Sequence, residues 1–491
     1  MSEPHIVIVG GGLAGLSTGV YARASGFRTT IVEHHQALGG VCTAWSRPPY
    51  LVDGCIHWLT GGPFARVYRE LGILPKVGLR TIERFVTLRD ARDGLEVVIA
   101  SDLDALAARL AALAPEDADE LRRMVEGARH VSDLRPPIAT PPELQSPWAG
   151  LLGLWGMRHE LPTLIHYRKP LGEYLASHVV NPRLRRLLGN LAPAEAPATF
   201  LLMMLGYLEH GWLSRPIGGT AAFRDALVDS YRERGGAVRL GATVEEILVE
   251  GGRARGVRLR DGSCVDADYV VSTASAPETV RHLLGGRYGA DALERRLGKW
   301  KLFQPIVVAS YGVELPLADA PSALTIDGLE PFEVGGRAND RLYLRILNDD
   351  PCFAPAGHSV VQVIAETDYD WWARRGGSYP GDKERIGAEL LAQIDRHLPG
   401  VRDAVRMTDV ATPLSFWSMA RSWRGAFEGW MPSSDDAYGH VEKTLPGLER
   451  LYLAGQWVEP GGGVPTACTS GRAVAQLIAA DALHLFRPPF D

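Results

Sequence analysis

Residues 5–19 read HIVIVGGGLAGLSTG, a short apolar run that leads directly into a cluster of glycines. The apolar part, HIVIV, is typical of a strand that is buried on both faces. Gly10, Gly12 and Gly15 then occupy the glycine positions of the GxGxxG pattern. The first glycine permits a tight turn, the second lets the backbone approach a pyrophosphate, and the third lets a helix pack closely against the strand. The stretch therefore predicts a nucleotide-binding turn.

The residues after the turn complete a strand–helix–strand unit. A segment of helical spacing begins with Leu13 and Ala14 and ends before Gly26. The β-branched stretch RTTIVE then ends on Glu33, which is followed by His34. An acid at this position accepts hydrogen bonds from ribose hydroxyls and would repel a 2′-phosphate. The order of strand, turn, helix, strand and acid predicts an α/β dinucleotide fold of the Rossmann type, with Glu33 and its neighbour His34 at the nucleotide.

A second glycine pair, Gly39-Gly40, follows the acid, and simple NAD dehydrogenases do not need a pair there. The stretch Val52-Asp53-Gly54 comes shortly afterwards. In this order the elements resemble those of the phytoene desaturase and carotenoid isomerase branch of the FAD-dependent amine oxidoreductases. The resemblance implies FAD as the cofactor, with the chain from Asp53 to Trp58 running beside the flavin. Val41 stands where many relatives carry arginine, which leaves the phosphate contact to backbone amides.

Two later blocks extend the resemblance to the whole chain. After RPIGGTAAFRDAL, residues 237–274 alternate like a β-meander, and the resemblance implies that the backbone of Val244 contacts the adenine. The block LYLAGQWVEPGGGVPTACTSGRAVAQLI reads as a strand that ends at Gly455, then a glycine loop, then a helix that begins near Gly463 and Val464. A helix N-terminus there would stabilise an anionic reduced flavin. Gln456 replaces an acid that relatives often carry.

These blocks divide the chain into interleaved parts. We expect a Rossmann-type, glutathione-reductase-like FAD-binding domain and an α+β substrate-binding domain inserted into it. The FAD-binding domain is predicted to comprise residues 1–90, 215–290 and 445–491. The substrate-binding domain is predicted to comprise residues 91–214 and 291–444.

Composition excludes several other classes of protein. The chain has 491 residues and a net charge of −6, so nothing indicates a nucleic-acid partner. The five cysteines are scattered and form no CxxC pair, so we expect neither a disulfide framework nor a metal site, and the cytoplasm is the simplest location. No apolar run approaches the roughly 18 residues that cross a bilayer.

Two apolar stretches with aromatic residues and methionine, residues 151–167 and 199–213, lie in the predicted substrate-binding domain. Such stretches form either ordinary core or the wall of a tunnel for a lipophilic substrate. They also fit an interfacial surface, so a peripheral contact with a membrane stays open. We therefore expect a lipophilic small molecule as the substrate.

The chemistry expected of the chain is removal or rearrangement of hydride on the substrate, because no second GxGxxG unit for NAD(P)H follows the first. The electron acceptor is left open between oxygen, a quinone and another acceptor. His57 is a candidate proton donor or acceptor because histidine titrates near neutrality, although it could simply wall the flavin together with Trp58. Glu459, beside the glycine loop, is the rival base. Asp53 fits a structural hydrogen-bonding role better.

Three functions remain open from the sequence. The first is an FAD-dependent oxidoreductase of desaturase or dehydrogenase type that acts on C–C or C=C bonds of a polyene, terpenoid or polyketide. The second is a flavin-dependent isomerase or reductive cyclase of natural-product biosynthesis. The third is an amine oxidase, against which Val41 counts because such relatives usually carry a basic residue there. Covalent attachment of the flavin to Cys42 or Cys468 is the less favoured alternative to noncovalent binding.

Overall fold

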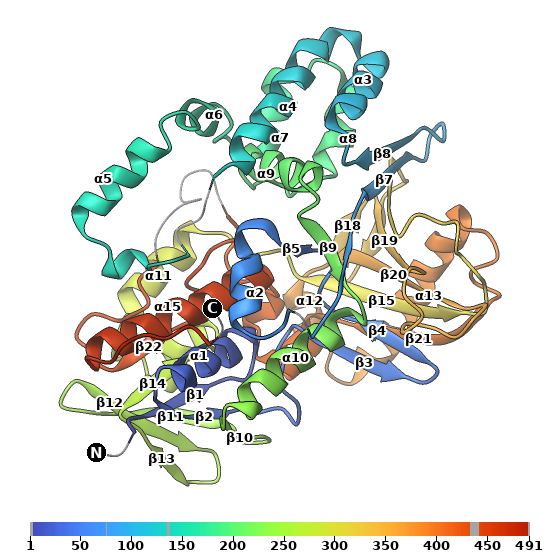
Figure 1. Ribbon diagram of the computed structural model, residues 1–491. Coiled ribbons are helices and arrows are strands. Elements are labelled where there is room, and N and C mark those ends of the chain that lie inside the picture. Colours follow the sequence, from blue (N-terminus) through green and yellow to red (C-terminus); the bar gives the residue numbers. More distant parts are fainter. Residues whose placement is uncertain (1–2, 75, 135–137, 433–440, 490–491) are drawn as a thin grey trace.

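A five-stranded parallel sheet is assembled from three distant parts of the chain (Figure 1). The structure is a computed structural model and describes residues 3–74, 76–134, 138–432 and 441–489. The strands follow the order β10-β2-β1-β14-β22, and every neighbouring pair is parallel. They are β1 (His5–Val9), β2 (Arg28–Val32), β10 (Ala237–Arg239), β14 (Tyr269–Ser272) and β22 (Leu451–Leu453). The predicted α/β fold of the Rossmann type is confirmed.

Glycines allow the helices beside this sheet to approach one another closely. A Cβ atom at Gly15 would lie 2.1 Å from the carbonyl oxygen of Gly10, so only glycine fits between the turn and the helix that follows it. A Cβ atom at Gly471 would lie 2.7 Å from the carbonyl oxygen of Ala14. The helices concerned are α1 (Leu13–Ala24), α10 (Gly219–Glu233) and α15 (Gly463–Asp481).

A second sheet of seven strands follows the order β21-β15-β20-β19-β16-β7-β8 and is antiparallel except where β16 pairs with β7. Apolar residues of α13 pack into the core of this sheet. The elements are β7 (Arg84–Asp90), β8 (Glu96–Ala100), β15 (Ile306–Val313), β16 (Ala323–Asp327), β19 (Leu342–Leu347), β20 (Ser359–Glu366), β21 (Val405–Ala411) and α13 (Tyr379–His397).

Helices form a separate layer at the top of Figure 1 and share one apolar core. They are α3 (Leu103–Leu113), α4 (Ala118–Ser132), α7 (Leu171–His178), α8 (Pro182–Gly189) and α9 (Ala198–Glu209). Of two further helices, α6 (Leu161–His166) packs against this layer through Leu164, and α5 (Pro147–Gly156) extends away from it (Figure 1). Within the described chain, no helix is long and apolar enough to cross a membrane.

Short elements connect these layers. Three small sheets are formed by β11-β12-β13, β5-β9-β6 and the hairpin β3-β4. Their strands are β3 (Ala44–Arg47), β4 (Tyr50–Asp53), β5 (Leu59–Thr60), β6 (Leu79–Thr81), β9 (Leu213–Pro216), β11 (Val244–Glu250), β12 (Arg253–Leu259) and β13 (Cys264–Asp266). The hairpin β17 (Phe332–Val334) and β18 (Arg337–Asn339) and the helices α2 (Ala65–Glu70), α11 (Ala290–Lys299), α12 (Tyr369–Ala373) and α14 (Pro413–Ala420) complete the set.

The structure differs from two details that the sequence predicts. Of the expected meander, only β11, β12 and β13 form an antiparallel sheet, while β10 and β14 join the parallel sheet. The reason for β14 is that all of its residues are buried, which suits a strand covered on both faces. In addition, β7 falls within the predicted first FAD-binding segment, residues 1–90, but it pairs with β16 and β8 of the seven-stranded sheet.

Candidate functional site

A cavity of about 1270 Å³ lies where the parallel sheet, the seven-stranded sheet and α9 meet. One part of its wall is backbone from the glycine turn after β1 and from the second glycine pair. Another part is largely apolar and is formed by side chains of α9, of strands β15, β19 and β20 of the seven-stranded sheet and of α14. The apolar wall includes Phe200, Met203 and Tyr207 of α9, Val308 of β15, Ile364 of β20 and Phe416 of α14.

The glycine part of the wall leaves room for a ligand to lie against the backbone. A Cβ atom built at Gly12 would meet no protein atom closer than 3.9 Å, so this backbone borders open space. Gly39 and Gly40 have φ angles of +127° and +59°, which glycine adopts without strain. The amide of Gly39 donates to the carbonyl oxygen of Gly11 at 2.8 Å and ties the two glycine segments together. This cradle fits a pyrophosphate, because a side chain would fill the space.

Glu33 ends β2 beside this cradle and is only 4% exposed. One carboxylate oxygen accepts from the amide of Gly11 at 2.7 Å, and the other accepts from the amide of His35 at 2.7 Å and lies 2.8 Å from Nδ1 of His34. Burial would raise the pKa of this carboxyl, but the hydrogen bonds from His34, His35 and Gly11 outweigh burial and lower the pKa. Glu33 is therefore an anion that also holds the glycine turn in place.

Of the other residues predicted to bind the nucleotide in the first segment, most line the cavity and one serves helix packing. Gly10, Leu13, Ala14, His34 and Val41 all line the cavity. The hydrogen bond with Glu33 raises the pKa of His34, whose Nε2 lies 3.1 Å from the carbonyl oxygen of Ser418. Gly15 is not among the lining residues, because it serves the close packing of α1 on the turn.

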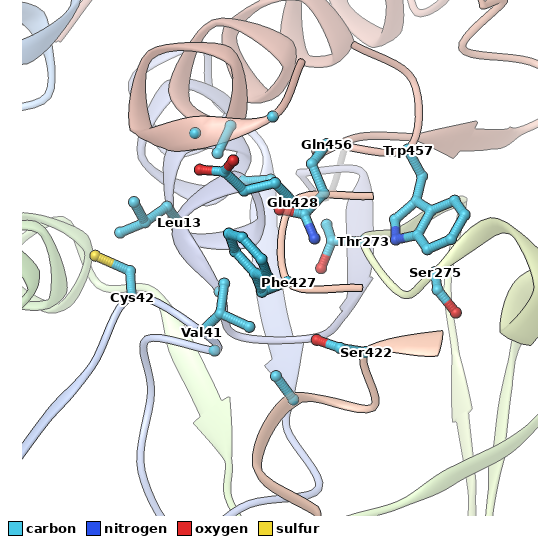
Figure 2. Close-up of a pocket in the computed structure, with 18 of the residues that line it drawn as sticks. Leu13, Val41, Cys42, Thr273, Ser275, Ser422, Phe427, Glu428, Gln456 and Trp457 are labelled. Atoms are coloured by element: carbon cyan, nitrogen blue, oxygen red, sulfur yellow. The ribbon is translucent and has the colours of Figure 1, made fainter. Parts of the chain in front are cut away.

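The last block places the start of α15 at the cavity, as shown at the top of Figure 2. Gly463 and Val464 begin this helix and line the cavity, together with Gly455 and Gln456. The side chain of Gln456 lies close to the start of α15 in Figure 2. The amides of a first helical turn have no partner within the helix, so they are available to a ligand oxygen. Val244, at the start of β11, lines the same cavity.

His57 and Trp58 line the cavity where the chain leaves β4. Burial holds the pKa of His57 well below its ordinary value of 6.5, and the nearby cations Arg345 and Arg215 lower it further. The imidazole is thus neutral at physiological pH and a poor proton donor. The premise that His57 titrates near neutrality is therefore wrong in this structure. The neutral imidazole is a weak proton acceptor, so the acceptor role stays a prediction, and the lowered pKa favours a wall role beside Trp58, whose ring packs against Phe85 with centroids 5.2 Å apart.

The sequence predicts Glu459 as a rival catalytic base, but the structure places it outside the cavity wall. It is not among the residues that line the cavity, and its carboxylate lies 3.0 Å from the ammonium of Lys443. The side chain of Lys443 is 1% exposed, and a buried ammonium requires a nearby anion. Glu143 lies 3.3 Å from the same ammonium. Glu459 thus compensates the buried charge of Lys443. The sequence did not indicate this pair, because no spacing pattern links the two residues.

Both cysteines considered for a covalent flavin bond are poor nucleophiles. The hydrogen bond with Cys55 and burial raise the pKa of Cys42 well above its ordinary value. Burial raises the pKa of Cys468 to about 12. Because the thiolate is the reactive form, neither thiol is activated for bond formation. Cys42 lines the cavity, whereas Cys468 lies behind it in the core.

Glu428 is a titratable residue of the cavity that the sequence analysis did not single out. It follows Phe427 in the segment between α14 and β22, and both side chains are drawn at the centre of Figure 2. The available signal was an acid between apolar neighbours in the stretch AFEGW. That pattern has no periodicity that distinguishes a cavity residue from a surface loop. Among the described residues, no group of three or more histidines, cysteines or acids is placed to hold a metal ion.

A parallel sheet with a glycine turn, a terminal acid and a second helix N-terminus at one cavity defines a dinucleotide-binding flavoprotein. The sequence pattern of the family described as flavin containing amine oxidoreductase matches residues 13–479. The chain belongs to this family. It is an FAD-dependent oxidoreductase, and the resemblance to phytoene desaturases is confirmed by its relatives.

Relatives and solved structures cover nearly the whole chain. A phytoene desaturase (lycopene-forming) of Pseudescherichia vulneris is 26% identical over 97% of this chain and 99% of the relative. A 4,4′-diaponeurosporene oxygenase of Staphylococcus aureus is 24% identical over 97% and 98%. The crystal structure of an oxidoreductase from Methanosarcina mazei has a TM-score of 0.65 at 18% identity, covering 96% of this chain and 100% of that one. Putrescine oxidase bound to putrescine has a TM-score of 0.62 at 15% identity, covering 97% and 99%, which shows a shared fold.

Proposed function

We propose that this protein removes hydrogen from C–C bonds of an extended lipophilic polyene, with noncovalently bound FAD. The observation that carries the proposal is the continuity of one cavity, in which the glycine cradle and the apolar wall of α9, β15 and β20 border the same space. Apolar walls bind an apolar chain by removing it from water, and they need few polar contacts to do so. Relatives described as phytoene desaturases support the choice of substrate class.

In this proposal the residues of the parallel-sheet region hold FAD. The cradle of Gly10, Gly12, Gly39 and Gly40 binds the pyrophosphate, and Glu33 accepts from the ribose. The backbone at Val244 contacts the adenine, and the start of α15 at Gly463 and Val464 binds the flavin end with Gln456. When bound, FAD supplies an acceptor for hydride.

The second region would hold the substrate and exclude water. We propose that the seven-stranded sheet and the helical layer of α3, α4 and α7–α9 form the substrate-binding domain. Phe200, Met203 and Tyr207 of α9 would lie along one side of the polyene, and Phe416 and Phe427 along another. An apolar wall of this kind keeps water from the reacting carbon and leaves proton transfer to the few titratable groups inside.

The test is anaerobic mixing of the FAD-loaded enzyme with phytoene or 4,4′-diapophytoene in detergent micelles, followed by flavin absorbance. We expect bleaching by a polyene and the appearance of a product with a longer chromophore. Putrescine and cyclohexylamine serve as the amine oxidase arm, and NADPH as the reductive arm. Rapid bleaching by an amine, or by NADPH alone, would overturn the proposal. Polyene turnover that changes double-bond geometry without bleaching would instead support the isomerase alternative.

We further propose that α5 contacts a membrane surface, from which a lipophilic substrate enters. Trp148, Leu152 and Trp155 on this helix are 75%, 71% and 71% exposed. Tryptophan and leucine on an exposed helix favour the lipid interface, and Arg158 next to the helix suits lipid phosphates. Cosedimentation with vesicles that contain anionic lipid should fall in the W148S/W155S variant. As a control, W371S changes a tryptophan of the opposite sheet region and should keep binding; equal binding by all three proteins would contradict the proposal.

A further inference from the structure

Glu428 occupies an unusual place in the cavity wall. Its side chain lies in the space between Phe427, Leu13 and the start of α15 (Figure 2). The backbone of Glu428 packs against the glycine that precedes α15, because a Cβ atom at Gly462 would lie 2.6 Å from both the Cβ and the carbonyl oxygen of Glu428. Gly462 has a φ angle of +58°, so the loop before α15 is shaped to admit this residue.

Glu428 differs from the other glutamates that line the cavity because none of the residues that the structure describes is a polar partner of its carboxyl. Glu33 accepts from the amides of Gly11 and His35. Glu245 pairs with Arg260 at 3.1 Å, and Glu278 lies 4.0 Å from His282. For Glu428, no hydrogen bond or ion pair is present anywhere in the described ranges of the chain. Its carboxyl is therefore free to bind or release a proton within the cavity.

Within the described parts of the neighbouring elements, no charge compensates this carboxyl. The first turns of α1 and α15 carry neither an acid nor a base. In the loop before α15, Glu459 is paired with Lys443. On its own segment, Arg424 is bound to Asp370. Burial is thus the one cause that acts on Glu428, and it raises the pKa from 4.5 to about 7. The carboxyl changes its protonation in the physiological range.

We propose that Glu428 is the proton-accepting catalytic residue of the dehydrogenation. This inference rests on the proposed function. Removing hydrogen from a C–C bond breaks two C–H bonds: one hydrogen leaves as hydride with its electron pair to oxidised FAD, and the other leaves as a proton. The electron pair of the second C–H bond forms the new C=C bond, and the carboxylate of Glu428 takes the proton. Glu428 then returns the proton to water before the next turnover.

The kinetic test compares the wild-type holoenzyme with E428Q and E428D in anaerobic flavin reduction by phytoene from about pH 5 to about pH 9. Because the carboxylate is the active form, the wild-type rate should rise with pH through about 7. E428Q should be about 10²–10⁴-fold slower and lose this rise, since proton-transfer groups contribute in that range. E428D should recover part of the rate with a shifted midpoint. A pH profile of E428Q equal to that of the wild type would overturn the inference.

A second measurement needs no substrate and separates this inference from the proposed function. Infrared difference spectra of the oxidised holoenzyme between about pH 6 and about pH 8 should show a carboxylic acid carbonyl band that disappears as pH rises. E428Q should lack the band, and E245Q, which changes a paired glutamate of the same wall, should keep it. If no polyene reduces the flavin, the proposed function fails. The band then decides the titration of Glu428, and its absence from the wild type or its presence in E428Q would overturn the assignment.

Discussion

Glu33 and Glu428 line one cavity, yet their surroundings move their pKa values in opposite directions. Glu33 is buried, but two backbone amides and His34 contact its carboxylate, so its pKa lies below the ordinary value. Glu428 is half-buried in the cavity wall, no described residue makes such a contact with it, and removal from water raises its pKa to about 7. The same side chain is thus a permanent anion at the nucleotide cradle and a titratable acid beside α15. Hydrogen bonding, rather than burial, decides between the two states.

The largest expected effect on cofactor affinity concerns Glu33. Glu33→Ala removes a charged acceptor for the ribose and also leaves the buried amide of Gly11 without its partner. A charge-assisted hydrogen bond contributes roughly 1.5–3 kcal/mol, so the affinity for FAD should fall about 10- to 100-fold. Equilibrium dialysis of the holoenzyme measures the change. E245Q, a change at a surface-paired glutamate of the same cavity, should lose far less; equal retention of FAD by Glu33→Ala and the wild type would contradict the role.

The second prediction compares how the two carboxyls affect unfolding of the FAD-depleted protein. Because the pKa of Glu428 is raised in the folded protein, its contribution to stability is complete below about pH 4.5. That contribution is lost as the pH rises through about 7. E428Q, which stays neutral, should therefore be more stable than the wild type by about 1–3 kcal/mol at about pH 8 and no more stable at about pH 4. Urea unfolding at the two pH values measures the difference.

Glu33 should show the reverse behaviour. Its lowered pKa means that its stabilisation is present above the ordinary value of 4.5 and is lost as pH falls through the lower folded-state pKa. E33Q should accordingly be less stable than the wild type at about pH 7, and the difference should shrink towards about pH 3. The comparison between the two residues would be contradicted if E33Q were more stable than the wild type at neutral pH. It would also be contradicted if E428Q were more stable than the wild type at acidic pH but not at about pH 8.

The smallest expected effect belongs to His57. Since Arg345, Arg215 and burial keep its imidazole neutral, His57→Ala should slow flavin reduction only a few-fold, with FAD still bound. Stopped-flow reduction of the holoenzyme, run in parallel with E428Q, measures both variants. A loss for His57→Ala that matches the roughly 10²-fold or greater loss expected for E428Q would return the proton-transfer role to His57.

Much of the nucleotide side of the site could be predicted from the sequence. The apolar strand from His5, the spacing of Gly10, Gly12 and Gly15, and Glu33 at the end of the next strand depend on neighbours within one strand–helix–strand unit. These local features require particular residue types at fixed spacing, because a bulkier residue at Gly15 would meet the backbone of Gly10. The structure places these residues in the strand–turn–helix–strand order that the sequence predicts.

The candidate catalytic side of the site could not be predicted in the same way. Burial, and then the cations Arg345 and Arg215 from two different sheets, lower the pKa of His57, and Glu459 is paired with Lys443. Glu428 becomes a cavity residue only because Gly462 admits its backbone. In each case the deciding partner is set by how distant segments pack.

The sequence by itself determined the class of fold, because a glycine turn, a strand and an acid act within a few residues of one another. The family resemblance carried by the second glycine pair and the later blocks indicated FAD as the cofactor. The tertiary structure alone decided which carboxyl is a permanent anion and which changes its protonation near neutral pH. The charge of a buried group depends on the hydrogen bonds and ions that surround it in three dimensions, and those neighbours have no fixed spacing along the chain. Glu33 and Glu428 are the same residue type, and only the packing of α1, α15 and the loop at Gly462 makes them different.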